Sequence, residues 1–229
     1  LLTIKDADAL DHPLSLSISL VWAVSVFLWA GDLERADEHI NRLLSRAELH
    51  SFGPYLAVGH GFQGELAVRQ GNAESGVGEL QRCLAELHAA PYELLTTPLN
   101  IALVQGLAAT GQFPEAFALI NEAIQSVETN GDACYMPELL RLRGGLALAA
   151  PQPDVGEAET QFRLSLELSR HQGARGWELR AALDLAALLA ARDERERARA
   201  LLQPLFEQFV EGLGTTDLRS AAHMLATLS

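Results

Sequence analysis

The segment GDLERA at residues 31–36 decides the fold, because its pattern returns as GNAESG at 71–76 and as GQFPEA at 111–116. The glycine recurs every 40 residues, and a small residue follows it five positions later. A fixed period of about 20–50 residues indicates an array of repeated supersecondary units. Glycine is typical of a helix C-terminus. Each segment is therefore predicted to join two helices, which the small residue allows to approach closely.

The helix that follows each glycine is predicted from apolar residues at steps of three and four. The small-residue position continues as Ala158 and Ala198, after a slip of two residues near Pro151. Apolar side chains stand four and eight positions beyond it: Ile40, Leu80, Ile120, Phe162 and Leu202, then Leu44, Leu84, Ile124, Leu166 and Phe206. The helices before the turns are expected at about 14–30, 54–70, 94–110, 135–149 and 174–191. No stretch shows the sustained alternation of a strand, so a sheet is not expected.

These features predict an all-α fold, a tetratricopeptide-like α-α superhelix of about five helix hairpins with a period of about 40 residues and a C-terminal capping helix. Residues 1–12 are interpreted as the remnant of a preceding repeat helix, in a chain cut from a longer protein. Residues 13–229 are interpreted as a single repeat domain. Its hairpins are expected at about 13–52, 53–92, 93–132, 133–172 and 173–212, with a terminal helix at 216–228.

The charge balance restricts the partners of this segment. The 229 residues include 17 basic and 30 acidic side chains, a net charge of −13. Because this charge repels phosphate backbones and anionic lipid surfaces, neither nucleic acid nor a membrane is expected as a partner. Cys83 and Cys134 stand far apart, which favours two reduced thiols and a cytoplasmic protein. Residues 13–30 carry no charge, but their four serines and their place in the repeat favour a buried helix over a membrane span.

Three stretches of the C-terminal half carry a family resemblance: PELLRLRG at 137–144, SRHQGARGWELRAA at 169–182 and EGLGTTDL at 211–218. They resemble the C-terminal repeats of bacterial predicted ATPases of the signal-transduction class, and HPLSL at 12–16 is similar to the opening of that region. The resemblance implies that a winged-helix or cyclase-like module and a P-loop ATPase precede the repeats, as in activators of the maltose-regulon type. It further implies that the repeat arm receives an inducer or a partner protein and restrains or releases the ATPase.

The segment GHGFQG at 59–64 matches the dinucleotide-binding pattern G-x-G-x-x-G, which requires a preceding strand and a helix N-terminus. Here the segment lies inside a predicted helix, so close helix packing is favoured over a phosphate site. A glycine inside a helix costs about 1 kcal/mol relative to alanine. A neighbouring helix, or a ligand approaching the backbone, is therefore expected to contact these glycines.

No catalytic, cofactor-binding or metal site is predicted, and the ATPase family's Walker motifs have no counterpart in the sequence. His50, His60, Cys83 and His88 share one predicted hairpin, but their spacings fit no metal-ligand motif. No nucleophile elbow accompanies a set of Ser, His and Asp. An enzyme, which is the alternative from another functional class, would require a buried cluster of titratable residues with shifted pKa values.

The first helix of each hairpin is expected to line the concave groove, so its polar residues are the candidates for recognition. The candidates are Ser25, Glu65 and Gln105 in one repeat column, His60 and Asn100 in another, and Arg141, Arg143, Trp177 and Arg180 in the later hairpins. The last four could hold a carboxylate or a planar ligand. Alternatively, they solvate the groove or pair with Glu138 and Glu178.

The leading hypothesis is a non-catalytic regulatory and protein-interaction scaffold. Its partner would be the ATPase module of the same full-length chain, another protein, or a second copy forming a homo-oligomer. The alternative is an effector-sensing domain that binds a small molecule in the concave groove. A closed pocket lined by His60, Asn100 and Arg141 would favour the sensor, whereas an open groove with an exposed apolar strip would favour a protein partner.

Overall fold

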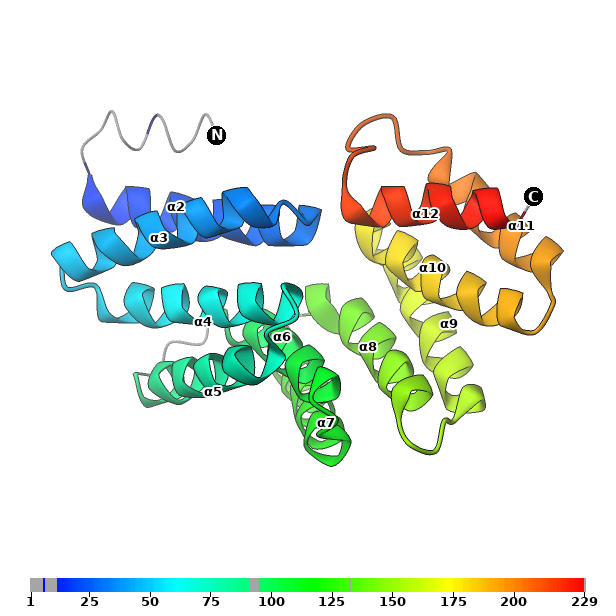
Figure 1. Ribbon diagram of the computed structural model, residues 1–229, viewed down its shortest axis with the longest axis horizontal. Helices are drawn as coiled ribbons and strands as arrows, with labels where there is room; N and C mark the ends of the chain where they lie inside the picture. The colour runs from blue at the N-terminus through cyan, green and yellow to red at the C-terminus, as the bar shows by residue number, and fades with distance from the viewer. Residues whose placement is uncertain (1–5, 7–11, 91–94, 132, 229) are drawn as a thin grey trace. The chain divides into compact units, whose positions relative to one another are not determined.

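The computed structural model describes residues 6, 12–90, 95–131 and 133–228. Over these residues it contains eleven α-helices, one 3-10 helix and no strand (Figure 1). The prediction for residues 1–12 lies outside the described residues, apart from Asp6 and His12. The helices are α2 (Pro13–Ala30), α3 (Leu33–Leu49), α4 (Gly53–Arg69), α5 (Ala73–Ala89), α6 (Thr96–Ala109), α7 (Phe113–Asn130), η1 (Ala133–Tyr135), α8 (Met136–Ala149), α9 (Val155–Gln172), α10 (Arg175–Ala191), α11 (Arg195–Phe206) and α12 (Thr216–Thr227).

The repeated glycines end the first helices in the way their spacing predicts. Gly31 has a φ of 76° and Gly71 a φ of 89°, a left-handed conformation that costs glycine nothing. After Gly71, the amide of Asn72 donates to the carbonyl of Ala67 at 2.8 Å, which closes the helix end with a Schellman-type bond. The chain can then reverse within two residues into the next helix.

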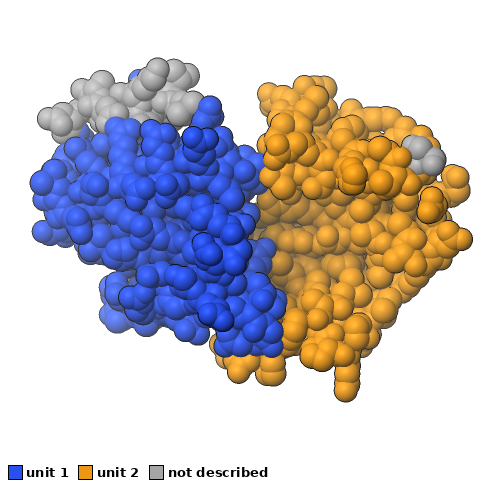
Figure 2. Space-filling model, in the orientation of Figure 1, with its two compact units in different colours: residues 1–112 blue, residues 113–229 orange. Residues whose placement is uncertain are grey.

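Unit 1 comprises residues 1–112 and its described helices are α2 to α6 (Figure 2). Each helix packs against the next one along the chain, and α4 also contacts α2 and α6. The side chains between them are fully buried and apolar: Leu20, Val24, Leu28, Ile40, Leu43, Phe62, Leu80 and Leu99. Burying each contributes roughly 1.5–3 kcal/mol, so the hairpins are held together mainly by these shared side chains.

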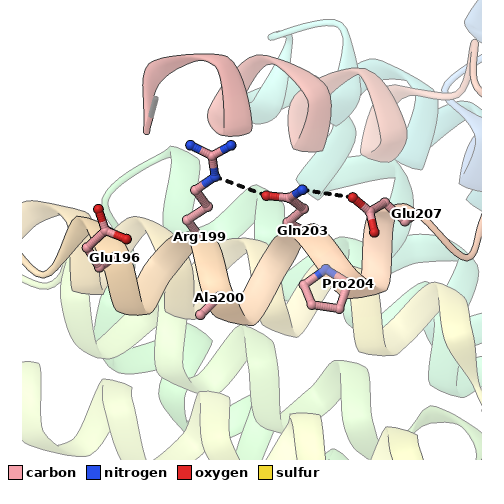
Figure 3. Close-up of a pocket in the computed structure, with 6 residues that line it drawn as sticks. All are labelled: Glu196, Arg199, Ala200, Gln203, Pro204 and Glu207. Atoms are coloured by element: carbon pink, nitrogen blue, oxygen red, sulfur yellow. Dashed lines mark hydrogen bonds between the residues drawn. The ribbon is translucent and has the colours of Figure 1, made fainter.

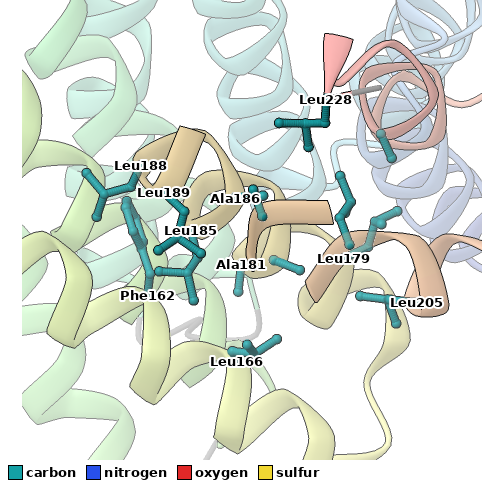
Figure 4. Close-up of a cluster of buried hydrophobic side chains, with 14 of the residues drawn as sticks. Phe162, Leu166, Leu179, Ala181, Leu185, Ala186, Leu188, Leu189, Leu205 and Leu228 are labelled. Carbon is teal, nitrogen blue, oxygen red and sulfur yellow. The ribbon is translucent and has the colours of Figure 1, made fainter. Parts of the chain in front are cut away.

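Unit 2 comprises residues 113–229 and contains α7 to α12. Here α8 contacts α10, and α10 contacts α12, in addition to the contacts between consecutive helices. The core of this unit is an apolar cluster that runs from α9 across α10 to the C-terminal residues (Figure 4). Its members include Phe162, Leu166, Leu179, Leu185, Leu202, Leu218 and Leu228. The terminal helix α12 contributes Leu218 and Ala221 to this core.

The GHGFQG segment lies within α4 and its glycines allow neighbouring helices to approach. A Cβ added at Gly61 would lie 2.7 Å from Sγ of Cys83 on α5 and 2.9 Å from Leu99 on α6. At Gly64 it would lie 3.0 Å from the backbone oxygen of Gly76. The contacts at Gly61 are closer than those of real Cβ atoms, and the contact at Gly64 is tighter than nearly all of them. These glycines therefore serve close helix packing, and the helix-packing interpretation of the motif is confirmed.

The helix α2 is long and apolar enough to cross a membrane by length and composition alone, and it is the one such helix among the described residues. One such helix is weak grounds for a membrane span. Leu16, Leu20, Val24 and Leu28 are buried, and the helix contacts α3 and α4. Its buried side therefore serves as part of the repeat array.

The helices before the turns begin and end within two residues of their predicted positions over the described part of the chain. The all-α repeat architecture is thus confirmed. The expected hairpin 93–132 contains α6 and α7, which belong to different compact units. The division of residues 13–229 into five hairpins of one domain stays a prediction.

Candidate functional site

Within each unit, the first helices of the hairpins lie side by side. In unit 1 α4 contacts both α2 and α6, and in unit 2 α10 contacts both α8 and α12. No comparable contact joins α3 to α5, or α9 to α11, over the residues described. We call these two surfaces the first-helix faces, made by α2, α4 and α6 in unit 1 and by α8, α10 and α12 in unit 2. All nine predicted candidates lie on these helices.

The first repeat column of candidates makes its described contacts within single helices. Ser25 is buried and its hydroxyl donates to the carbonyl of Val21 at 3.0 Å. Glu65 is also buried and accepts from Nε and Nη2 of Arg69, one turn further along α4, at 2.8 and 2.7 Å. Gln105 is half-buried on α6. The described polar bonds thus satisfy Ser25 and Glu65 within their own helices.

His60 on α4 and Asn100 on α6 are both half-buried, on helices that contact each other. A pocket of about 740 Å³ in unit 1 is lined elsewhere, by the ends of α4 and α6 and the start of α5: Ala67, Gly71, Asn72, Ala73, Glu74, Ser75, Ala109 and Thr110. It is a wide surface depression of small and polar residues. This pocket therefore does not include His60 or Asn100.

Five charged side chains of unit 2 form a connected network between α8, α10 and α12, which we call the five-charge network. Arg141 donates from Nε and Nη2 to the two carboxylate oxygens of Glu138, each at 2.8 Å. Its Nη1 donates to Oδ2 of Asp184 at 2.6 Å. Arg180 donates from Nη1 to Oε1 of Glu138 at 3.3 Å and from Nε to Oδ2 of Asp217 at 2.7 Å. Ion pairs thus join all three helices of this first-helix face.

The network changes the pKa values of its own members. Burial alone would raise the pKa of Glu138, which is 2% exposed, but Arg141 and Arg180 outweigh burial and hold this pKa below its ordinary value. Burial raises the pKa of Asp184, and the charge of Arg141 offsets this only in part. With three carboxylates and two guanidiniums, the network carries a formal charge of −1 when every group is ionised.

The remaining candidates of unit 2 divide between this network and other pairs. The guanidinium carbon of Arg180 lies 5.0 Å from the ring centroid of Trp177, within the range of a cation-π interaction. Arg143 instead pairs with Glu157 on α9, at 3.0 Å. Glu178 pairs with Arg170 on α9, at 2.7 Å. The structure therefore brings Arg141, Trp177 and Arg180 together and places Arg143 elsewhere.

Sequence reasoning did not identify Asp184 and Asp217 as members of this site. Asp184 lies one turn beyond Arg180, and Asp217 lies in the first turn of the terminal helix. The sequence nevertheless contained a signal for this ion-pair network. Glu138 and Arg180 occupy equivalent positions of successive first helices once the two-residue slip is counted. Opposite charges in one repeat column predict an ion pair between neighbouring helices.

A second pocket lies along α11 in unit 2, with a volume of about 260 Å³ (Figure 3). Arg199 donates from Nε to Oε1 of Gln203 at 3.0 Å, and Gln203 donates from Nε2 to Oε1 of Glu207 at 2.8 Å. The lining residues come from α11 and from the residue that follows its last turn: Glu196, Arg199, Ala200, Gln203, Pro204 and Glu207. Over the described residues, no group of three or more His, Cys, Asp or Glu side chains is placed to hold a metal ion.

Solved structures of helical repeat proteins share the fold of this chain. A putative kinesin light chain from Podosopora anserina with nearly identical TPR-like repeats matches at a TM-score of 0.54 and 18% identity, over 85% of this chain and 95% of that one. The apo form of the quorum sensor NprR from B. thuringiensis matches at a TM-score of 0.51 and 12% identity, over 93% of this chain and 69% of that one. The chain has a TPR-like helical repeat fold. It matches no family model, and no curated protein matches it in sequence.

Proposed function

We propose that this chain is a non-catalytic regulatory scaffold that binds a segment of another protein on the first-helix face of unit 2. The observation that carries the proposal is the five-charge network, which joins α8, α10 and α12 and leaves two of its carboxylates partly exposed. Asp184 and Asp217 are 35% and 29% exposed at the side chain, so both remain accessible to a partner.

The charge of this face favours a basic partner segment. The cationic groups of Arg141 and Arg180 are already bonded to the chain's own carboxylates, so this face attracts a ligand carboxylate only weakly. Three carboxylates against two guanidiniums leave an excess negative charge, and the whole chain has a net charge of −13. Arginine or lysine side chains of a partner would neutralise that excess.

Peptide display on the immobilised chain tests this proposal. We expect selected peptides to be enriched in Arg and Lys, and the double variant Asp184→Asn, Asp217→Asn to bind them at least about tenfold more weakly. The matched control is Glu122→Gln, which removes one exposed charge from the second helix α7 and should leave binding unchanged. Circular dichroism verifies that both variants fold. Peptides without a basic preference, or equal loss in the control, would overturn the proposal.

We further propose that this scaffold belongs to a larger protein. We place it as the C-terminal repeat arm of a bacterial signalling ATPase or transcriptional regulator, because stretches 137–144, 169–182 and 211–218 resemble that family. The natural partner would then be the ATPase module of the same polypeptide, in the cytoplasm, where the two free thiols suit reducing conditions. In a polypeptide carrying both modules, the double variant is expected to change basal ATP turnover.

The second candidate function is an effector-sensing domain that binds a small molecule. The fold likeness to the quorum sensor NprR, which extends over 93% of this chain, favours this candidate. Thermal-shift measurements against metabolites and nucleotides discriminate the two, because a ligand that binds only the folded state raises the melting temperature. A shift with one small molecule, without any basic peptide preference, would favour the sensor over the scaffold.

A further inference from the structure

The helix α8 contains a glycine, Gly145, that the packing of the described residues does not explain. Other glycines inside helices would place an added Cβ within 3.0 Å of a neighbouring atom: Gly59, Gly61, Gly64, Gly76, Gly106 and Gly144. At Gly145 an added Cβ would meet nothing within 4 Å. Because glycine is among the least favourable residues inside a helix, α8 is destabilised at this position without a compensating contact from the described part of the chain.

Gly145 lies on the same side of α8 as the five-charge network. It follows Glu138 by seven residues and Arg141 by four, a spacing that places all three on one stripe of a helix. On this stripe Arg141 bonds to Asp184 of α10, and Glu138 bonds to Arg180 of the same helix. Gly145 itself is half-buried. The first-helix face of unit 2 is therefore bare one turn beyond Arg141.

The equivalent positions of the other first helices differ between the two units. At intervals of 40 residues, the equivalents of Gly145 in unit 1 are Ser25, Glu65 and Gln105. After the two-residue slip, the equivalent on α10 is Ala187, which is exposed and lies one turn beyond Asp184. The helices α8 and α10 thus have only small residues in the column where the first helices of unit 1 have polar ones.

We infer that the main chain of the basic partner segment lies against α8 at Gly145, and that a cationic side chain of this segment binds Asp184. This contact rests on the proposed function, in which the partner is a basic protein segment. Glycine allows another backbone to approach closely because it has no Cβ. Asp184 accepts from Arg141 through Oδ2 at 2.6 Å, and the described residues provide no hydrogen bond to its Oδ1. That oxygen can accept from an arginine or lysine of the segment.

Uncharged substitutions at Gly145 test this contact, because they leave the long-range attraction between a basic ligand and the acidic chain unchanged. The probe is a hexa-arginine peptide, and its binding to the full chain is measured by isothermal titration calorimetry at about 0.15 M salt. Gly145→Ala should weaken binding about threefold. Gly145→Gln, which gives α8 the residue that α6 has at the equivalent position, should weaken it at least about tenfold.

The stability of the free chain should change in the opposite direction to binding. Gly145→Ala should raise the melting temperature by about 2–4 °C, because alanine is the better helix former and its Cβ meets no neighbour. A loss of binding in a more stable chain cannot result from misfolding. The matched controls are Gly78→Ala and Gly78→Gln on the second helix α5, where an added Cβ also meets nothing within 4 Å. Both controls should bind hexa-arginine like the wild type.

Several outcomes would overturn this inference. Unchanged binding in both Gly145 variants would do so, and the proposed function would still stand if the double variant Asp184→Asn, Asp217→Asn lost binding. Equal losses in the Gly78 variants would mean that the effect does not arise on the first-helix face. A lower melting temperature of Gly145→Ala would mean that the folded chain itself requires this glycine. A wild type that does not bind hexa-arginine, or a double variant that binds it fully, would instead overturn the proposed function.

Discussion

Arg180 lies 3.3 Å from Glu138, and this ion pair joins two successive first helices, α8 and α10, at equivalent positions of the repeat. The carboxylate is almost fully buried and also accepts two hydrogen bonds from Arg141. Buried charges are tolerated only when they are paired and hydrogen-bonded. The pair therefore sets a strict geometric requirement, because a displacement of α8 against α10 would leave a charge without its partner.

Replacing Glu138 by alanine should be strongly destabilising. The substitution leaves the guanidiniums of Arg141 and Arg180 without their shared carboxylate, and breaking a buried pair typically costs about 3–5 kcal/mol. Urea denaturation followed by circular dichroism measures this loss. The matched control is Glu79→Ala, which removes a carboxylate from an exposed pair with Arg82 and should cost less than about 1 kcal/mol. Equal losses in the two variants would contradict the assigned role of burial.

The same carboxylate predicts a dependence of stability on pH. The pKa of Glu138 is lower in the folded chain than its ordinary value of 4.5, so its contribution is present at neutral pH and is lost as the pH falls from 4.5 toward the folded pKa. The stability difference between wild type and Glu138→Gln should thus shrink below pH 4.5.

The pKa of Asp184 shifts in the opposite direction to that of Glu138, so Asp184 is an internal control for the dependence of stability on pH. Its pKa is raised above the ordinary value of 3.8, so the folded state binds a proton more tightly than the unfolded state does. Its contribution to stability is then present below pH 3.8 and is lost as the pH rises through the folded pKa. Relative to Asp184→Asn, the wild type should lose stability over that rise. Parallel pH profiles for the two variants would refute this account of the network.

Close packing between α4 and α5 predicts stability changes that do not depend on charged groups. A Cβ added at Gly76 would lie 2.6 Å from the backbone oxygen of Gly64 and 2.6 Å from Val68. Gly76→Ala should therefore cost about 1–3 kcal/mol through overpacking. Gly78→Ala, two residues along the same helix, meets nothing within 4 Å and should stabilise the chain by about 1 kcal/mol. The contrast in melting temperature between the two variants is the measurement, and a stabilised Gly76→Ala chain would disprove the close contact.

The two cysteines are expected to differ in reactivity. Cys83 is buried, and burial raises the pKa of its thiol to about 12, whereas Cys134 is exposed. Because the thiolate is the reactive species, Cys83 should resist alkylation in the folded chain at pH 8. Mass spectrometry after iodoacetamide treatment should find one modified thiol in the native state and two in urea. Modification of Cys83 under native conditions would show that α5 opens locally.

The helices and turns were predictable from the sequence because they depend on local periodicity. The glycine at 31, 71 and 111 and the apolar columns after it place two helices in each repeat, and the structure has them there. The packing role of Gly61 and Gly64 was also predictable, since helical glycines need a compensating contact.

The five-charge network was predictable only in part. Arg141 and Arg180 stood out as cations on first helices, but Asp184 and Asp217 resemble ordinary solvated carboxylates in the sequence. Their partners lie 43 and 37 residues away in the chain. A repeat column identifies the helices that meet, but it does not determine which long side chains reach across. That choice depends on rotamers and burial, which no periodic pattern encodes.

The turn before α11 allows a final prediction, in which the backbone alone decides the outcome. Asp193 has a φ of 62° and occupies the turn position that is glycine in the first three turns. The next amide, that of Glu194, donates to the carbonyl of Leu189 at 3.0 Å, and the equivalent bond is present in those three turns. A side chain is strained in this left-handed conformation by roughly 1–2 kcal/mol, somewhat less for Asp.

Asp193→Gly should therefore stabilise the chain by about 0.5 kcal/mol, since relief of strain exceeds the added flexibility of the unfolded chain. Gly71→Ala, where an added Cβ meets nothing within 4 Å, should destabilise it by about 1 kcal/mol. Urea denaturation measures the free energy of unfolding of both variants. The prediction requires a gain for Asp193→Gly and a loss for Gly71→Ala. Loss of stability in Asp193→Gly would mean that the Asp193 side chain, whose pair with Arg195 is highly exposed, contributes more than the backbone strain it imposes.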